Sequence, residues 1–175
     1  MKKLIIICVI STFTNSVFAQ KWENYLQLGV GTGYLVNADI NDTPFLQFEY
    51  GKTYRWLDIG AALEYANSST YNNKYCSLVL KTKFDVVRMF SKNSHHSFKL
   101  GTGVGIGTAN LDNWYEIPYN HSQKYSSANY TLYSVMASYE YKIADKTSLG
   151  VFFNNYTSDT FFGLHYLGLC IRRNF

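Results

Sequence analysis

The sequence FFGLHYLGLCIRRNF, residues 161–175, alternates between two kinds of side chain. One parity is largely apolar and comprises His165, Leu167, Leu169, Ile171, Arg173 and Phe175. The other parity is small or polar and comprises Tyr166, Gly168, Cys170, Arg172 and Asn174. This period of two predicts a β-strand. Because the sequence stops on this strand, its edge needs a partner, and a closed barrel supplies one by pairing the last strand with the first.

The same alternation recurs along the chain. Strands are expected at residues 25–36, 45–51, 56–65, 75–86, 98–106, 130–143, 148–155 and 161–175. At 25–36 and 98–106, large residues alternate with glycines, which predicts a narrow barrel whose large apolar residues face outward. We therefore predict an all-β fold, an eight-stranded antiparallel up-and-down transmembrane β-barrel. The alternative is a soluble lipocalin-like barrel, in which the large residues would face a ligand cavity.

The connections and the aromatic residues indicate how such a barrel is oriented. One set of connections is long and rich in Asn, Ser, Thr and Tyr: Asn37–Pro44, Ala66–Lys74, Ala109–Ser127 and Asn154–Thr160. The other set is shorter on average: Gly51–Arg55, Phe90–Ser97 and Ala144–Thr147. Long outer loops and short periplasmic turns are typical of outer-membrane barrels. Two aromatic girdles are expected, Tyr34, Tyr65 and Tyr133 at the outer rim and Tyr50, Tyr139, Tyr141 and Phe175 at the inner rim.

Residues 1–19 are expected to be a cleaved signal peptide. Lys2 and Lys3 precede an apolar run at residues 4–10, and Val17 and Ala19 suit a signal peptidase. An uncleaved N-terminal anchor is less compatible with so short a run. Cleavage near Ala19 leaves residues 20–175 as one β-barrel domain, with 14 Lys and Arg against 12 Asp and Glu. This small net charge, without a basic block, predicts no nucleic-acid partner.

The signal peptide, the alternating strands and the terminal Phe175 resemble the small eight-stranded outer-membrane β-barrel family, of the OmpA/OmpX-like kind. The resemblance implies a location in the bacterial outer membrane, in contact with membrane lipid and lipopolysaccharide. It also implies insertion by the outer-membrane barrel assembly machinery, directed by a closing strand that ends in Phe175. Arg173 departs from the apolar parity, but an arginine near a strand end can snorkel to the headgroups. The family spans adhesins, lipid-A enzymes and structural anchors, so the resemblance implies no single activity.

Ten charged residues are expected on the inner face of the barrel. They are Glu49, Asp58, Glu64, Lys81, Lys83, Asp85, Lys99, Glu140, Lys142 and Arg172. Side chains just fill the interior of an eight-stranded barrel, so this mixed-sign set predicts a neutralised polar plug. A proton or ion path is the alternative. A wide solute pore is not expected, because such channels need about 16 strands.

The sequence shows no recognisable catalytic, cofactor-binding or metal-ligating set, so no enzyme activity and no cofactor are expected. The alternative is a lipid-A-modifying barrel, because residues 149–158 are faintly similar to a strand of an acyl-hydrolase family. Asn155 stands there where that family has its histidine, and an amide cannot act as the general base. His165 is another histidine nearby, and the simpler interpretation is an interfacial residue that faces lipid. Cys76 and Cys170 are expected to be free thiols, since they lie near opposite ends of the barrel.

The connection at residues 110–127 is the candidate contact surface for an extracellular ligand. Its aromatic and polar side chains suit such a contact, and they include Trp114, Tyr115, Tyr119, His121 and Tyr125. The alternative is an ordinary outer loop whose aromatic residues merely lie near the headgroups. The sequence thus predicts a barrel with a structural or surface-binding role.

Overall fold

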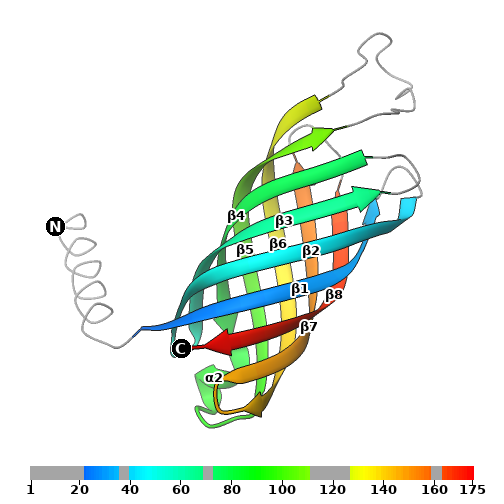
Figure 1. Ribbon diagram of the computed structural model, residues 1–175. Helices are drawn as coiled ribbons and strands as arrows, with labels where there is room; N and C mark the ends of the chain where they lie inside the picture. Colours follow the sequence, from blue (N-terminus) through cyan, green and yellow to red (C-terminus); the bar gives the residue numbers. More distant parts are fainter. Residues whose placement is uncertain (1–21, 36–39, 69–72, 111–126, 159–162) are drawn as a thin grey trace, which may run out of the picture.

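The computed structural model describes residues 22–35, 40–68, 73–110, 127–158 and 163–175, and they form a closed, tilted barrel (Figure 1). The elements are β1 (Glu23–Leu35), β2 (Ile40–Tyr54), β3 (Leu57–Ser68), β4 (Asn73–Asp85), α2 (Val86–Phe90), β5 (His96–Asn110), β6 (Ser127–Ala144), β7 (Thr147–Ser158) and β8 (Leu164–Asn174). Each strand pairs antiparallel with its sequence neighbours, and β1 pairs with β8. The prediction of an all-β, eight-stranded antiparallel up-and-down barrel is confirmed. The expected signal peptide, residues 1–19, lies outside the described residues.

The closure between β1 and β8 runs the full length of β8 and joins the two ends of the sheet. Leu28 lies opposite Ile171, and Tyr25 lies opposite Asn174. Beyond the last ladder pair, the backbone N–H of Phe175 donates to the Asn24 carbonyl at 2.9 Å, and the Asn24 N–H donates to the Phe175 carbonyl at 3.1 Å. Closure leaves no unpaired strand edge, which would otherwise invite pairing with another chain.

The two faces of the barrel are inverted relative to a soluble protein. Large apolar side chains from all eight strands are exposed on the outer face, for example Val30, Leu80 and Leu169, at 55%, 61% and 64% exposure. Charged side chains such as Glu49 and Lys81 are instead buried inside. The strict alternation follows from the strand geometry, which points successive side chains to opposite faces. In the described part of the chain, no helix is long and apolar enough to cross a membrane.

The inward glycines make room for aromatic rings from other strands. A Cβ atom on Gly29 would lie 2.9 Å from the Phe152 ring, and one on Gly168 would lie 2.6 Å from the same ring. At the other end, a Cβ atom on Gly51 would lie 2.7 Å from the ring of Tyr25. The alternation of large residues with glycine therefore lets a narrow barrel enclose whole rings.

Two local predictions need correction. The strand predicted at 45–51 runs from Ile40 to Tyr54, so most of the predicted connection Asn37–Pro44 is strand, and the inner turn consists of Arg55 and Trp56 instead of residues 51–55. Gly51-Lys52-Thr53 looks like a turn sequence, but in the strand the Thr53 hydroxyl donates to Asp58. The short helix α2 was not expected. Asp85 caps it, accepting a hydrogen bond from the Arg88 N–H at 3.0 Å, as N-terminal aspartates commonly do.

Candidate functional site

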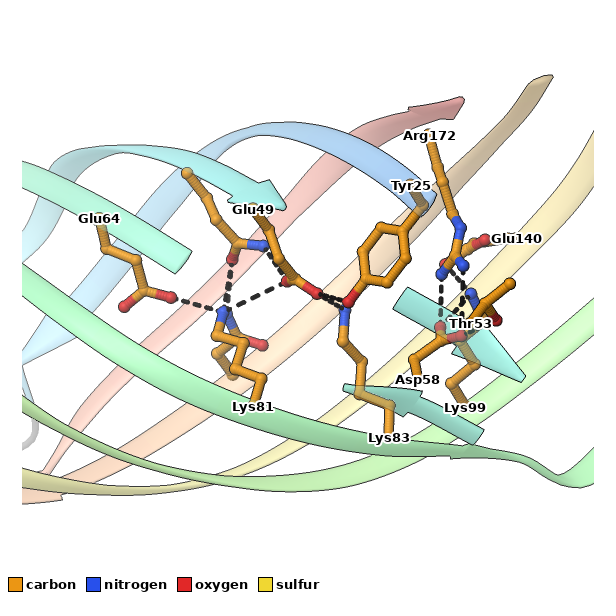
Figure 2. A network of polar contacts seen from close by, with 12 residues as sticks. Tyr25, Glu49, Thr53, Asp58, Glu64, Lys81, Lys83, Lys99, Glu140 and Arg172 are labelled. Carbon is orange, nitrogen blue, oxygen red and sulfur yellow. Dashed lines mark hydrogen bonds and ion pairs between the residues drawn. The ribbon is translucent and has the colours of Figure 1, made fainter. Parts of the chain in front are cut away.

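The most elaborate site in the described residues is a network of charged side chains inside the barrel (Figure 2). Its eight core members come from six strands and are at most 4% exposed. They are Glu49 of β2, Asp58 and Glu64 of β3, Lys81 and Lys83 of β4, Lys99 of β5, Glu140 of β6, and Arg172 of β8. We call these eight residues the lumen network. All eight were predicted from the inward parity of their strands.

At its outer end, the network is centred on Lys81. The Lys81 ammonium lies 2.5 Å from a Glu64 oxygen and 3.8 Å from Glu49. It also donates to the Gln47 amide oxygen at 3.0 Å. The Tyr156 hydroxyl donates to the same Glu64 oxygen, Oε1, at 2.6 Å. The buried ammonium group thus has two acceptors within hydrogen-bond distance, a carboxylate and an amide oxygen, and a second carboxylate farther away.

Glu49 lies at the centre of the network and is fully buried. Its carboxylate lies 2.6 Å from the Lys83 ammonium and accepts a hydrogen bond from the Tyr25 hydroxyl at 2.6 Å. The Gln47 amide donates to its second oxygen at 2.9 Å. Lys83 is ion-paired to Glu49, so removing either charge would leave the other buried without this partner.

Toward the inner end, Asp58 and Glu140 hold two cations (Figure 2). Arg172 forms an ion pair with Asp58 through a short contact. Lys99 lies 3.0 Å from Asp58 and 2.8 Å from Glu140. The Arg172 guanidinium also lies 3.8 Å from the ring centroid of Tyr25, in the geometry of a cation–π contact. Tyr25 therefore links the central and inner parts of the network.

The two remaining residues of the predicted set lie elsewhere. Asp85 is buried at the inner mouth, where it accepts from the Ser97 hydroxyl at 2.6 Å and pairs with Arg88 at 3.2 Å. Lys142 lies outside the network: its side chain is partly exposed at the rim, 3.8 Å from Asp145. Lys142 has the inward parity and pairs regularly with Ser148, but it lies at the end of β6, next to the turn into β7. At the rim of the barrel its long side chain reaches solvent.

The charges of the lumen network balance. Four carboxylates (Glu49, Asp58, Glu64 and Glu140) face four cations (Lys81, Lys83, Lys99 and Arg172), and each has an opposite charge within 4.0 Å. A buried ion is costly unless it is paired and hydrogen-bonded, and here both conditions hold. The chemical consequence is a fixed, neutral interior that crosslinks six strands.

Above the network, the outer half of the interior is filled by aromatic and apolar side chains. Phe45 stacks on Tyr166 with ring centroids 4.1 Å apart, and Tyr156 meets Tyr166 edge-on. The space left among these residues amounts to about 10 Å³ and is lined by Phe45, Tyr75, Tyr130 and Tyr166, among others. That volume is about the size needed for one water molecule.

The uncharged members of the site were not among the residues predicted from the sequence. Tyr25, Gln47, Thr53, Asn154 and Tyr156 all hydrogen-bond to network residues or to one another. Their inward parity was the available signal, but a search for charges alone passes over neutral donors. They provide hydrogen bonds that the ion pairs alone do not make.

The other candidate residues are not part of the lumen network. The predicted contact residues Trp114, Tyr115, Tyr119, His121 and Tyr125 lie outside the described residues. The described residues contain no group of three or more His, Cys, Asp and Glu that could hold a metal ion. His96 is at the inner rim, where its Nδ1 lies 2.6 Å from the Tyr139 hydroxyl.

The two cysteines and His165, the histidine considered as a catalytic candidate, are on the barrel wall. Cys76 is exposed and Cys170 is buried, and both are free, as predicted. His165 lies on the outer face of β8, between the rings of Tyr34 and Phe153.

A closed eight-stranded barrel with a charged interior and an apolar exterior is the fold of the small outer-membrane β-barrels, as the sequence resemblance predicted. Three solved structures are similar to this chain. Neisserial surface protein A aligns with a TM-score of 0.62 at 11% identity, covering 88% of this chain and 97% of its own. The N-terminal β-barrel domain of Pseudomonas aeruginosa OprF aligns with a TM-score of 0.55 at 11% identity, covering 89% and 100%.

The third is Ail, the attachment invasion locus protein of Yersinia pestis, solved with the heparin analogue sucrose octasulfate. It aligns with a TM-score of 0.52 at 12% identity, covering 88% of this chain and 97% of its own. No protein-family model and no curated protein sequence matches the chain. At these identities the likeness is one of fold.

Proposed function

We propose that this chain is an integral protein of the bacterial outer membrane with a structural or surface-binding role. The observation that carries the proposal is the continuous apolar outer face. Every strand exposes large hydrophobic side chains there. The eight charges of the lumen network pair inside the barrel, and Asp85 pairs with Arg88 at the inner mouth. In water such an exterior would drive aggregation, whereas in a bilayer it matches the surrounding hydrocarbon.

The aromatic residues support a definite orientation in the bilayer. Tyr50 and Phe175 lie together at the inner end, with ring centroids 6.4 Å apart, and Tyr139 and Tyr141 lie near His96 on the same rim. Tyr34, Tyr65 and Tyr133 are exposed on the outer halves of their strands. Amphipathic rings favour the two membrane interfaces, so these girdles bracket the hydrocarbon.

We further propose that the barrel passes no solute. This part rests on the lumen network and on the aromatic residues above it, which leave little free space. A planar-bilayer recording tests it: discrete conductance steps from the purified barrel, absent from an empty-detergent control, would contradict the proposal. A flat baseline across a range of voltages is expected.

The surface-binding role concerns the outer connections. Ail is a precedent on this fold, because its structure contains a heparin analogue. The outer connections and the strand ends next to them have five acidic residues, Asp39, Asp42, Asp112, Glu116 and Asp159, and two basic ones, Lys74 and Lys124. That balance does not favour a sulfated glycan, so we propose contacts through the aromatic residues of 110–127, Trp114 and Tyr115 first. Binding to cell-surface extracts with and without W114A/Y115A would test it.

Outer-membrane lipid, lipopolysaccharide and the barrel assembly machinery are the other proposed partners. A direct test of the whole proposal is fractionation followed by electrophoresis of boiled and unboiled samples. We expect the chain in the outer-membrane fraction, with a mobility that changes on heating because the closed barrel resists detergent. Recovery as a soluble periplasmic protein without a mobility change would refute it.

A lipid-modifying activity is not favoured by the geometry. His165 lies directly across from Asn155. Ser158, the serine nearest to it in the sequence, is three residues farther along β7, which is about 10 Å at the rise per residue of a strand. That distance is too long for a histidine to activate a serine. Lipid-A mass spectra from cells with and without the protein should therefore be the same.

A further inference from the structure

The outer face of the barrel has a polar interruption near the outer girdle, on β7 and β8. Asn155 and His165 are opposite each other in the antiparallel register, and both are half-buried. Tyr34 of β1 lies opposite His165 on the other side, and Thr157 is the next outward residue of β7. If the barrel spans the membrane, an amide and an imidazole here face lipid. Polar groups in that setting are costly and usually have a partner.

The imidazole ring of His165 is held in a fixed orientation by aromatic neighbours. It is nearly parallel to the Phe153 ring, with centroids 6.1 Å apart and planes 12° apart, and to the Tyr34 ring, at 6.5 Å and 18°. Its Nδ1 is buried and has no hydrogen-bond partner among the described residues. A buried unpaired N–H is rarer than a buried unpaired lone pair, so we assign the proton to Nε2. The ring then offers one N–H donor.

The charge of this surface restricts what it can bind. On the outward face of β1, β7 and β8, the described outer-half residues include no Lys, Arg, Asp or Glu. A phosphate group would call for Arg or Lys there, since these are the side chains that recognise it. A neutral acceptor suits the amide of Asn155 and the Nε2–H of His165. At the level of the aromatic girdle, the neutral acceptors of a bilayer are the carbonyl groups that join the acyl chains to their headgroup.

We propose that Asn155 and His165 form a lipid-binding site for the carbonyl of an ester- or amide-linked acyl chain of the outer leaflet. Phe153 lies beneath the carbonyl site and packs against the upper part of the chain, and Tyr34 borders it on the other side. The site rests on the proposed membrane location and goes beyond it by naming the lipid group that is bound. No bond of the lipid is broken.

The test compares two lipids that differ only in the carbonyl. The purified barrel, refolded in detergent, is titrated with a phosphatidylcholine with ester-linked C14 chains and with its ether-linked analogue, and bound lipid is measured by native mass spectrometry. We expect at least fivefold tighter binding of the ester lipid, which corresponds to one net hydrogen bond or more. The preference should fall in H165F and in N155V, each of which removes one of the two donors, and it should vanish in the double variant H165F/N155V. T108V, which removes an outward polar group of β5, away from β7 and β8, should keep the preference.

Equal binding of the two lipids by the wild-type chain, or a preference that is undiminished in both H165F and N155V or persists in H165F/N155V, would overturn the proposal. Inorganic phosphate provides a third arm: ¹⁵N-histidine spectra in which phosphate alone shifts the His165 resonance would indicate an anion site and also overturn it. Heat-modifiable mobility shows whether each variant is folded. If H165F does not fold, N155V alone provides the test. A wild-type chain that fails to insert into lipid at all would instead contradict the proposed function.

Discussion

Removing the negative charge of Glu49 should destabilise the barrel far more than removing a charge at its rim. Glu49 is fully buried, and its carboxylate is the ion-pair partner of Lys83 at 2.6 Å. In E49Q the amide still accepts from the Tyr25 hydroxyl, so the shape and one hydrogen bond are kept. Lys83 is left as a buried ammonium without its ion-pair partner, and the lumen network has four cations against three carboxylates.

The expected size of the effect follows from the burial. Breaking a buried ion pair by removing one partner costs about 3–5 kcal/mol. With a urea dependence of about 2 kcal/mol per molar, a loss of that size lowers the unfolding midpoint by roughly 1.5–2.5 M. In the double variant E49Q/K83M the unpaired ammonium is absent as well. We expect it to recover most of the stability, because replacing both partners of a buried pair is often nearly neutral.

The assay is reversible urea unfolding of the barrel in lipid vesicles, followed by tryptophan fluorescence and by gel mobility. K142M is the matched control, because it removes a lysine from the same barrel at a partly exposed site beside Asp145. Its midpoint should change little, since exposed ion pairs contribute little. If E49Q lowered the midpoint no more than K142M, or if E49Q and K83M were simply additive, the coupled network would be refuted.

Three further predictions concern packing, access and assembly. G51A should destabilise the barrel by about 1–3 kcal/mol, because the added Cβ would clash with the Ile59 backbone carbonyl of β3 and lie 2.7 Å from the Tyr25 ring, and the same urea titration measures the loss. A small maleimide should label exposed Cys76 in the folded barrel but buried Cys170 only after unfolding; equal labelling rates, read by mass spectrometry, would argue against the inward placement of Cys170. Deleting Phe175 should reduce the heat-modifiable fraction in cells, compared with L167A on the same outer face; unchanged assembly would remove the proposed role of the terminal residue.

The sequence was sufficient to predict the faces of the strands. Leu28, Val30, Leu78 and Leu80 lie outward, and Glu49 lies inward, because a strand points alternate side chains to opposite sides whatever its neighbours are. The prediction was wrong at two places. Lys142 has the inward parity but lies at the rim of the barrel, where its side chain is partly exposed, and Gly51-Lys52-Thr53 has turn-like composition inside a longer strand.

The contact surface at residues 110–127 stays a prediction, as do the signal peptide and the assembly role of Phe175. For the first two segments the sequence offers composition and position, and residues 1–21 and 111–126 lie outside the described residues. The binding role is therefore a proposal that rests on the fold and on the outer connections as a group.

What the sequence by itself determined is the set of inward charges and the apolar outer face, since both follow from a local period of two. What only the tertiary structure decided is which charges meet. Glu49 and Lys83 are 34 positions apart, and Asp58 and Arg172 are 114 apart. Their pairing depends on the register of every strand and on the closure of β1 against β8, which no short stretch of sequence contains. The same holds for Asn155 and His165, which a local pattern leaves as separate residues and the barrel brings side by side.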